Sequence, residues 1–381
     1  MANYSSAFVV SHVIYRTGSS HTPLEGPYSS VCKALTELNI PVTFCLTPLG
    51  SYEKPILYNS PGKESLFYLP RILTKYTTIK YLFDVAVVFF MVIRFYWNNK
   101  DKKKIVIGVD SLSCISLILL KKILNFKLVF YSVDYNSSRF ENSFLPVLYQ
   151  KCDAFASRFS DQVWAVCQSL IDQKKQEYGV NALYIPNSSI FDGRIYETHK
   201  ELKTGNKVAW TGSLLTEKQF DILFSVAKKI EKIRPDLEFY FVPTSNYEKF
   251  RLFSKKYKLK RAMVLELHSR SEWQQFAARC DIGIAIYDDK FESTRFIEPL
   301  KIWDFMLCGM PFIISSEPSI SNPIKKSGVA YFLKPGNKLP NDKSLSTFLK
   351  QTNLKRLQLQ CMSLAKEYDI KKQIENALKK L

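Results

Sequence analysis

The chain has 381 residues, of which 46% are apolar and 23% charged, so it can form two folded domains and does not belong to the disordered class. Its formal net charge of +19 predicts anionic partners, such as phosphorylated substrates or an acidic lipid surface. Zinc-finger spacing and an aromatic–basic RNA signature are both missing, so no specific nucleic-acid partner is expected. The eight cysteines contain no CxxC pair, which favours a reducing, cytoplasmic compartment.

In chain order, the first half alternates short β-branched runs with helical periodicity. Strands are expected at 7–15, 42–46, 104–109, 127–133, 162–166 and 182–185, and helices at 28–38, 112–124, 145–159 and 169–178. This alternation predicts an α/β domain over residues 1–190, with a parallel sheet covered by helices on both faces.

The segment 79–97 is the most apolar part of this half. Its uncharged run, 85–93, is shorter than the ~18 residues that cross a bilayer, so a buried helix is expected. The basic run KDKKK at 100–104 follows at once, which also allows a helix at an anionic lipid interface. The two interpretations are compatible.

After a polar linker at 191–206, the alternation restarts. A second α/β domain is expected over 207–350, with strands at 207–211, 237–242, 262–267, 281–287 and 311–315 and helices at 217–233, 271–279 and 299–308. Residues 351–381 predict a basic helical tail that could pack back on the first domain. The fold class is therefore α/β with two Rossmann-like domains, and ligands are expected at the carboxyl ends of the strands, in the cleft between them.

The segment 298–311 carries the clearest chemical signal. Glu298 is expected at the N-cap and Pro299 at the first helical position, while Gly309 and Pro311 end the helix. Lys301 in the first turn opposes the helix dipole, unless a phosphate binds there. Asp304 lies on the same face of the helix as Lys301, and a carboxylate there could accept hydrogen bonds from a ribose diol. From the helix alone, a surface ion pair fits equally well.

Four ordered motifs resemble the GT-B glycosyltransferases, especially the GT4-like group. They are IPN at 185–187, WTGS at 210–213, the run from Ser269 to Tyr287, and PLKIWDFMLCGMP at 299–311. The resemblance implies two Rossmann-like domains whose parallel sheets face each other across a cleft. It also implies that Lys301 binds a diphosphate and Asp304 a ribose, and that Gly212 and Ser213 let the backbone approach the phosphates.

The sequence also departs from the retaining GT4 pattern. Asp304 replaces the usual Glu, and Phe296 occupies the position of a second Glu eight residues upstream. Inversion is therefore slightly favoured. Glu298 and Arg295, beside the predicted donor helix, are further candidate donor ligands, although Arg295 could equally be a solvated charge.

The predicted catalytic base is Asp134, which follows the apolar strand in KLVFYSVDY. This stretch resembles the inverting glucuronosyltransferases of exopolysaccharide assembly, which place their catalytic Asp there. His21 is a second candidate base, and Glu25 and His12 are candidate acceptor-binding residues. The alternatives are a turn cap for Asp134 and a solvated loop position for His21, while Asp110 is expected to cap the helix after it.

The sequence thus predicts a metal-independent glycosyltransferase that needs no cofactor. It would move a hexosyl or glycuronosyl group from a nucleoside-diphosphate sugar to a lipid-linked or saccharide acceptor in polysaccharide or glycoconjugate synthesis, as a peripheral protein at the inner face of the membrane. No metal-binding DxD pair occurs at a strand end. The alternatives are a non-catalytic nucleotide-sugar-binding protein on the same fold and, last, a sugar-nucleotide epimerase.

Overall fold

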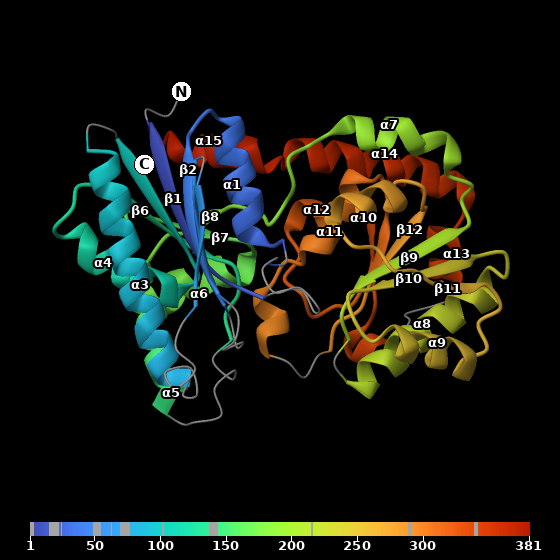
Figure 1. The fold of residues 1–381 in the computed structure, drawn as a ribbon. Coiled ribbons are helices and arrows are strands. Elements are labelled where there is room, and N and C mark those ends of the chain that lie inside the picture. Colours follow the sequence, from blue (N-terminus) through green and yellow to red (C-terminus); the bar gives the residue numbers. More distant parts are fainter. Residues whose placement is uncertain are drawn as a thin grey trace. The chain divides into compact units, whose positions relative to one another are not determined.

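A computed structural model describes residues 4–14, 23, 25–48, 55–61, 63–68, 77–100, 103–136, 144–214, 216–288, 292–338 and 342–381. The chain divides into two compact units. Unit 1 comprises residues 1–190 and 370–381, and unit 2 comprises residues 191–369. Both are α/β units, as the sequence predicts (Figure 1).

The sheet of unit 1 has eight strands in the order β4-β3-β2-β1-β5-β6-β7-β8. Six of them run parallel, because their apolar runs are buried by helices on both faces. The strands are β1 (Ser6–Val13), β2 (Val42–Pro48), β3 (Ile56–Ser60), β4 (Lys63–Phe67), β5 (Lys104–Val109), β6 (Lys127–Ser132), β7 (Gln162–Ala165) and β8 (Leu183–Tyr184).

One edge of this sheet carries two antiparallel strands that the sequence did not predict. Strands β3 and β4 form an antiparallel hairpin that pairs with β2. Residues 64–67 of β4 are exposed or half-buried, so this strand lacks the continuous apolar run that identified the parallel strands. The intervening Pro61-Gly62 is a turn signal typical of such a connection.

Two groups of helices cover the sheet of unit 1. Helices α3, α4 and α5 share a core with one face of the sheet, and α4 packs against both α3 and α5. Helix α15, from the far end of the sequence, packs against α1 (Figure 1). The helices are α1 (Pro27–Glu37), α3 (Thr77–Asn98), α4 (Ser111–Lys121), α5 (Phe144–Phe159), α6 (Gln168–Tyr178) and α15 (Ile370–Leu378).

The sheet of unit 2 has six parallel strands in the order β11-β10-β9-β12-β13-β14. They are β9 (Lys207–Gly212), β10 (Glu238–Pro243), β11 (Ala262–Val264), β12 (Ile282–Ala285), β13 (Phe312–Ile314) and β14 (Ala330–Phe332). The α-helices described in this unit are α7 (Gly193–His199), α8 (Glu217–Ile233), α9 (Tyr247–Lys256), α10 (Arg270–Ala277), α11 (Leu300–Leu307), α12 (Asn322–Ser327), α13 (Asp342–Phe348) and α14 (Gln351–Glu367). Short 3-10 helices lie at η2 (Lys200–Leu202), η3 (Glu292–Phe296) and η4 (Pro335–Asn337).

Two predicted segments differ from the observed structure. The segment 191–206, predicted as a linker, contains α7, because the Asp192 side chain accepts a hydrogen bond from the Arg194 amide and caps a short helix. The predicted tail, 351–381, is two helices. Helix α14 belongs to unit 2, and only α15 belongs to unit 1.

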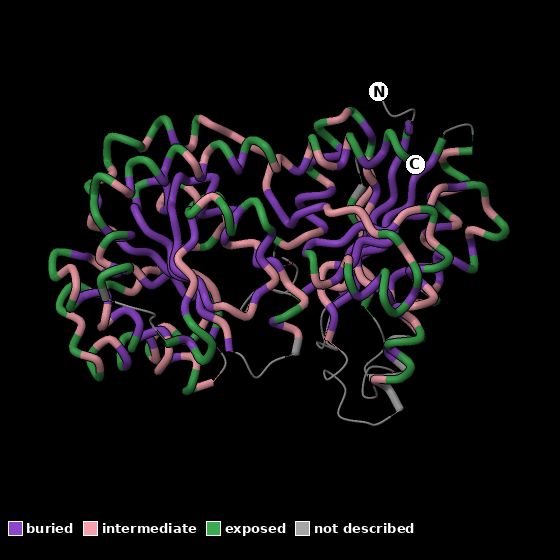
Figure 2. Tube along the Cα trace, turned by 180° about the vertical axis from the view of Figure 1, so that it is seen from behind, coloured by how far each residue is buried: buried purple, intermediate pink, exposed green. Residues whose placement is uncertain are grey.

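Each unit has its own core (Figure 2). In unit 2 the buried strands carry large side chains, such as Trp210 on β9, whose ring centroid lies 4.9 Å from that of Phe250 on α9. Among the described residues, no helix combines the length and apolar character needed to span a bilayer.

Candidate functional site

The strand order of unit 2 places a ligand position beside β9. The chain runs from β9 through β10 to β11 and then returns to β12, on the other side of β9. In open parallel sheets, ligands bind outside the carboxyl ends of the strands where the order reverses in this way. The residues at that point are Thr211 and Gly212, at the end of β9, and Tyr287, two residues beyond β12.

Lys301, in the first turn of α11, reaches this point. Its Nζ donates to the carbonyl oxygen of Thr211 at 2.7 Å. The same atom lies 5.3 Å from the ring centroid of Trp210 and 5.4 Å from that of Tyr287, within the range of cation–π attraction. Among the described residues it forms no ion pair with a carboxylate.

The electrostatics of Lys301 favour an added anion. The side chain as a whole is half-buried, but the atoms around its ammonium remove water from it, and this desolvation lowers the pKa of Lys301 to about 8. A carbonyl and two rings offset that cost only in part. A phosphate oxygen at the ammonium would favour the charged form, so the site suits an anionic ligand.

Gly212 allows the ammonium to approach the end of β9. Its φ is +130°, a backbone conformation that other residues rarely adopt, and a Cβ built there would lie 2.8 Å from the Nζ of Lys301. The sequence predicted that Gly212 would leave room for phosphates; the structure shows it leaving room for Lys301. Ser213, which follows, is exposed.

Helix α11 begins one residue later than predicted. Pro299 occupies the N-cap in extended conformation and makes no side-chain cap, so Glu298 is not the N-cap residue. Instead, the buried Glu298 carboxylate accepts a hydrogen bond at 2.7 Å from the amide of Ser321, next to α12. Gly309 has a φ of +62° and ends the helix as expected.

Asp304 is held by α10. Its carboxylate accepts hydrogen bonds from the Arg270 guanidinium, the shortest at 2.8 Å, and from the Gln274 amide at 2.9 Å. The residue is buried. A ribose diol would therefore meet a carboxylate that already has two protein partners, which the sequence did not indicate.

Two further cations lie on helices that follow these strands in the chain. Arg295 is exposed on η3. Lys218, which the sequence reasoning missed, lies in the first turn of α8 and forms an ion pair with the buried Asp288 at 2.7 Å. Its position in the sequence could have indicated this role, because α8 follows the carboxyl end of β9. The first turn of a helix after a central strand is a common anion site.

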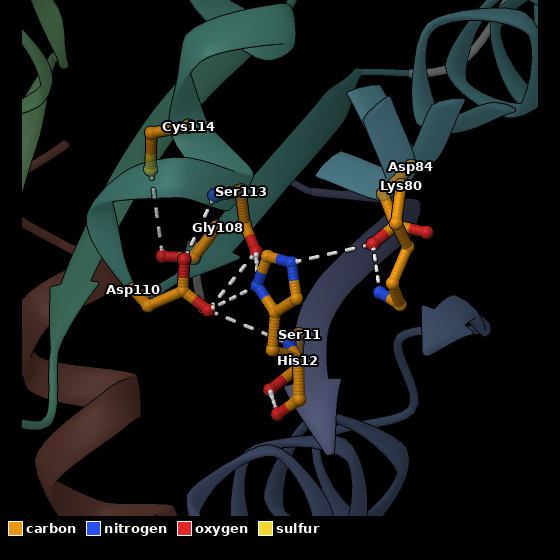
Figure 3. A network of polar contacts seen from close by, with 8 residues as sticks. All are labelled: Ser11, His12, Lys80, Asp84, Gly108, Asp110, Ser113 and Cys114. Atoms are coloured by element: carbon orange, nitrogen blue, oxygen red, sulfur yellow. Dashed lines mark hydrogen bonds and ion pairs between the residues drawn. The ribbon is translucent and has the colours of Figure 1, made fainter. Parts of the chain in front are cut away.

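Unit 1 carries a polar network at its own point of reversed strand order, between β1 and β5 (Figure 3). The Nδ1 of His12, on β1, lies 2.8 Å from an Asp110 carboxylate oxygen just beyond β5. The other carboxylate oxygen of Asp110 accepts the Ser113 amide at 2.8 Å, so Asp110 caps α4 as predicted. Asp110 has a φ of +84°, a strained conformation for a non-glycine residue.

The network extends to α3. The Nε2 of His12 lies 3.9 Å from a carboxylate oxygen of Asp84, which forms an ion pair with Lys80 one turn earlier (Figure 3). Burial raises the pKa of Asp84, although Lys80 acts against this shift. His12 is thus positioned between two carboxylates, and the sequence singled out His12 without either partner.

The other residues predicted for unit 1 are not part of this network as described. Asp134 is half-buried, two residues beyond β6. Glu25 is exposed just before α1 and pairs with Lys33 at 2.9 Å. His21 lies outside the described residues. Within the described ranges, no group of three or more His, Cys, Asp or Glu residues could hold a metal ion.

Comparison with known proteins gives matches among solved structures. No family model and no curated protein matches the chain. Sucrose-phosphate synthase from Thermosynechococcus elongatus matches with a TM-score of 0.65 and 10% identity, over 98% of each chain. HepE from Anabaena, in complex with UDP, matches with a TM-score of 0.60 and 14% identity, over 99% of this chain and 100% of its own.

A third match is WaaG, described as a glycosyltransferase involved in lipopolysaccharide biosynthesis. It has a TM-score of 0.58 and 14% identity, over 98% of each chain. The chain has the GT-B fold. In this GT-B chain, Lys301 of unit 2 and the His12 network of unit 1 each lie where the strand order of a sheet reverses.

Proposed function

We propose that this GT-B protein is a glycosyltransferase. It would take a hexosyl or glycuronosyl group from a nucleoside-diphosphate sugar, uridine- or guanosine-linked, and transfer it to a lipid-linked or saccharide acceptor in polysaccharide or glycoconjugate synthesis. The donor diphosphate would bind at Lys301 and the amino end of α11, with Gly212, Ser213, Glu298 and Arg295 around it.

The observation that carries this proposal is the environment of Lys301. An ammonium with a lowered pKa, held by a carbonyl and two aromatic rings at a reversal of strand order, is stabilised best by an anion. The same cation would stabilise the negative charge that develops on the leaving diphosphate. HepE, one of the matched structures, was solved with UDP, which is an anion of this kind.

Acceptor activation is assigned to unit 1. We propose Asp134 as the base that removes the acceptor hydroxyl proton, with inversion at the sugar, and His21 as a second candidate. His12 and Glu25 would contact the acceptor. Neither a metal ion nor a cofactor is part of the proposed reaction, and the protein would work in the cytoplasm at the inner face of the membrane, which its net charge of +19 favours.

Lys301→Met tests the donor site. We expect it to weaken the binding of UDP or GDP, measured by calorimetry, by at least about tenfold, because a charge-assisted hydrogen bond to phosphate contributes roughly 1.5–3 kcal/mol. Lys355→Met is the matched control, since Lys355 is an exposed lysine on α14 of the same unit, and it should bind like the wild type. Unchanged affinity in Lys301→Met would remove the basis of the proposal.

A second candidate function is a non-catalytic nucleotide-sugar-binding protein. The engagement of Asp304 by Arg270 and Gln274 favours it, because a ribose has no uncommitted carboxylate there. The discriminating assay measures diphosphate release from a panel of sugar nucleotides, with and without Asp134→Asn. If diphosphate is released and Asp134→Asn reduces this release at least about a hundredfold, the protein is an enzyme. Tight binding of a sugar nucleotide without diphosphate release supports the second candidate.

A further inference from the structure

The outer surface of the α3, α4 and α5 layer is unusually apolar. Among the described residues, eight of the fourteen exposed large apolar side chains belong to these helices or directly follow α4. They are Leu82, Phe90, Trp97, Leu119, Ile123, Val147, Leu148 and Phe159. Because α4 packs against both α3 and α5, they lie on one continuous layer, which we call the outer face of unit 1 (Figure 1).

The exposed residues of α3 form a stripe. Leu82, Ala86, Phe90 and Trp97 are exposed, and a spacing of four, four and seven residues keeps them on one side of a helix over ~22 Å. The opposite side buries Val88, Val92 and Phe95 in the core of unit 1. The helix therefore has two apolar sides, and only one of them has a partner within the described residues.

The exposed charges that the structure describes on the three helices are all positive. The exposed cations of these helices and of the described residues just after α3 and α4 are Arg94, Lys100, Lys122, Lys151 and Arg158. The only acids in the three helices are Asp84 and Asp153, and both are buried and ion-paired with lysines. Asp161, just beyond α5, is paired with Lys121 at 2.9 Å and Lys127 at 3.4 Å.

We infer that the outer face of unit 1 docks on an anionic lipid bilayer, with Leu82, Phe90 and Trp97 entering the interface. Among the described residues of the three helices, the apolar side chains are accompanied by exposed cations and by no exposed acid. This matches the two layers of such a surface, acyl chains below and negative headgroups above. A protein partner would more often need acids as well. Trp97 stacks under Lys100, 4.2 Å from the ring centroid, and this pairs an interfacial ring with a headgroup-binding cation. The inference extends the proposed location at a membrane, and it does not depend on transfer chemistry.

The chain supplies its own reporter. Of its five tryptophans, Trp97 is 56% exposed, and Trp164, Trp210, Trp273 and Trp303 are buried. A blue shift of tryptophan emission on adding vesicles, with quenching by brominated acyl chains, would therefore report entry of Trp97 into lipid. Trp97→Phe should abolish the shift but leave most of the vesicle binding, since Phe keeps an apolar ring.

The test compares two matched pairs of substitutions on the full chain. Leu82 and Phe90 are each 66% exposed, and Leu252 and Leu359 of unit 2 are 64% and 65% exposed. Binding is measured by sedimentation with vesicles of phosphatidylcholine alone or with phosphatidylglycerol. We expect the wild type to bind only the vesicles that contain phosphatidylglycerol. The double variant Leu82→Ser with Phe90→Ser should lose vesicle affinity by about tenfold or more. The control, Leu252→Ser with Leu359→Ser, should bind like the wild type. All variants should unfold at the wild-type temperature.

Several results would overturn the inference. The first is that the wild type does not bind phosphatidylglycerol vesicles at 0.1 M salt. The second is that both double variants lose vesicle affinity equally. The third is that the wild type forms a dimer that the Leu82 and Phe90 substitutions dissociate. Nucleotide binding and diphosphate release are measured on the same samples. If those fail while vesicle binding follows the outer face, the proposed function is wrong and the docking face remains. If nucleotide binding and diphosphate release are observed but vesicle binding does not depend on the outer face, only the docking inference is rejected.

Discussion

Burial of the Lys301 ammonium at the proposed ligand position reduces the stability of the folded protein. Desolvation lowers its pKa to about 8, so the folded state binds its proton less tightly than the unfolded state does. This group's contribution to the free energy of unfolding therefore increases as the pH rises from that pKa towards the unfolded value near 10.5. A cost of this kind is typical of binding sites, where the ligand supplies the missing partner.

The same pKa predicts how nucleotide binding depends on pH. A diphosphate favours the ammonium, so affinity should fall as the pH rises above about 8, by roughly tenfold for each pH unit at the limit. Calorimetric titrations with UDP or GDP between pH 7.5 and 9.5 measure this. Lys301→Met, titrated alongside, reports the ionisation of the nucleotide itself. A wild-type profile parallel to that of the variant would contradict the prediction.

Single residues could be predicted where their neighbours in sequence determine them. Lys301 stood out because it lies in the first turn of a sharply bounded helix, and the capping role of Asp110 follows from local spacing. The partners of these residues could not be predicted. Arg270 lies 34 residues from Asp304, and His12 lies 98 residues from Asp110, so only the fold brings each pair together.

Elements with a continuous apolar run were located well from the sequence, and those without one were not. The strand predicted at 104–109 matches β5, and the helices of both units mostly lie within one or two residues of their predicted bounds. The hairpin β3–β4 and helix α9 were missed, because a five-residue strand beside a polar edge strand and a helix with six polar residues of ten lack that signal. Buried charges such as Lys174, paired with Asp153, look like solvent-exposed residues in the sequence.

The position of α11 depends on one strand glycine. A Cβ built on Gly283, in β12, would lie 2.6 Å from the ring of Phe305 on α11. Gly283→Ala should therefore force the helix away from the sheet and lower the free energy of unfolding by about 1–3 kcal/mol. Nucleotide affinity should fall as well, since Lys301 moves with the helix.

Denaturant unfolding and calorimetry measure the two effects of Gly283→Ala. Gly26→Ala is the control, because nothing lies within 4 Å of its Cβ position and the backbone there is extended. Unchanged stability in Gly283→Ala would mean that α11 can shift without cost. The position of Lys301 would then not depend on the tight packing of α11 against β12.

On the scale of the whole molecule, unit 2 is inserted into unit 1. The chain leaves unit 1 after Ile190 and returns at Ile370, so that α15 completes unit 1 by packing against α1. Helix α15 buries Ile370, Ile374, Ala377 and Leu378. The sequence predicted a helical tail at this end of the chain, but periodicity alone could not divide it between the two units.

Truncation after Asp369 should therefore weaken unit 1 and leave unit 2 folded. Loss of three large buried side chains removes roughly 5 kcal/mol of apolar burial, comparable to the whole stability of a domain. Limited proteolysis with mass spectrometry should show rapid cleavage between residues 25 and 190 and protection between 207 and 338. A chain ending at Leu378 keeps α15 and is the control. Equal protection of both regions would show that α15 is dispensable.

This insertion sets an order of events during synthesis. The ribosome releases all of unit 2 before it releases α15, so unit 2 can fold while unit 1 still lacks one of its helices. Until then the part of α1 that packs against α15 stays uncovered. An early stop codon or a stalled ribosome would leave an incomplete protein that chaperones and proteases can recognise.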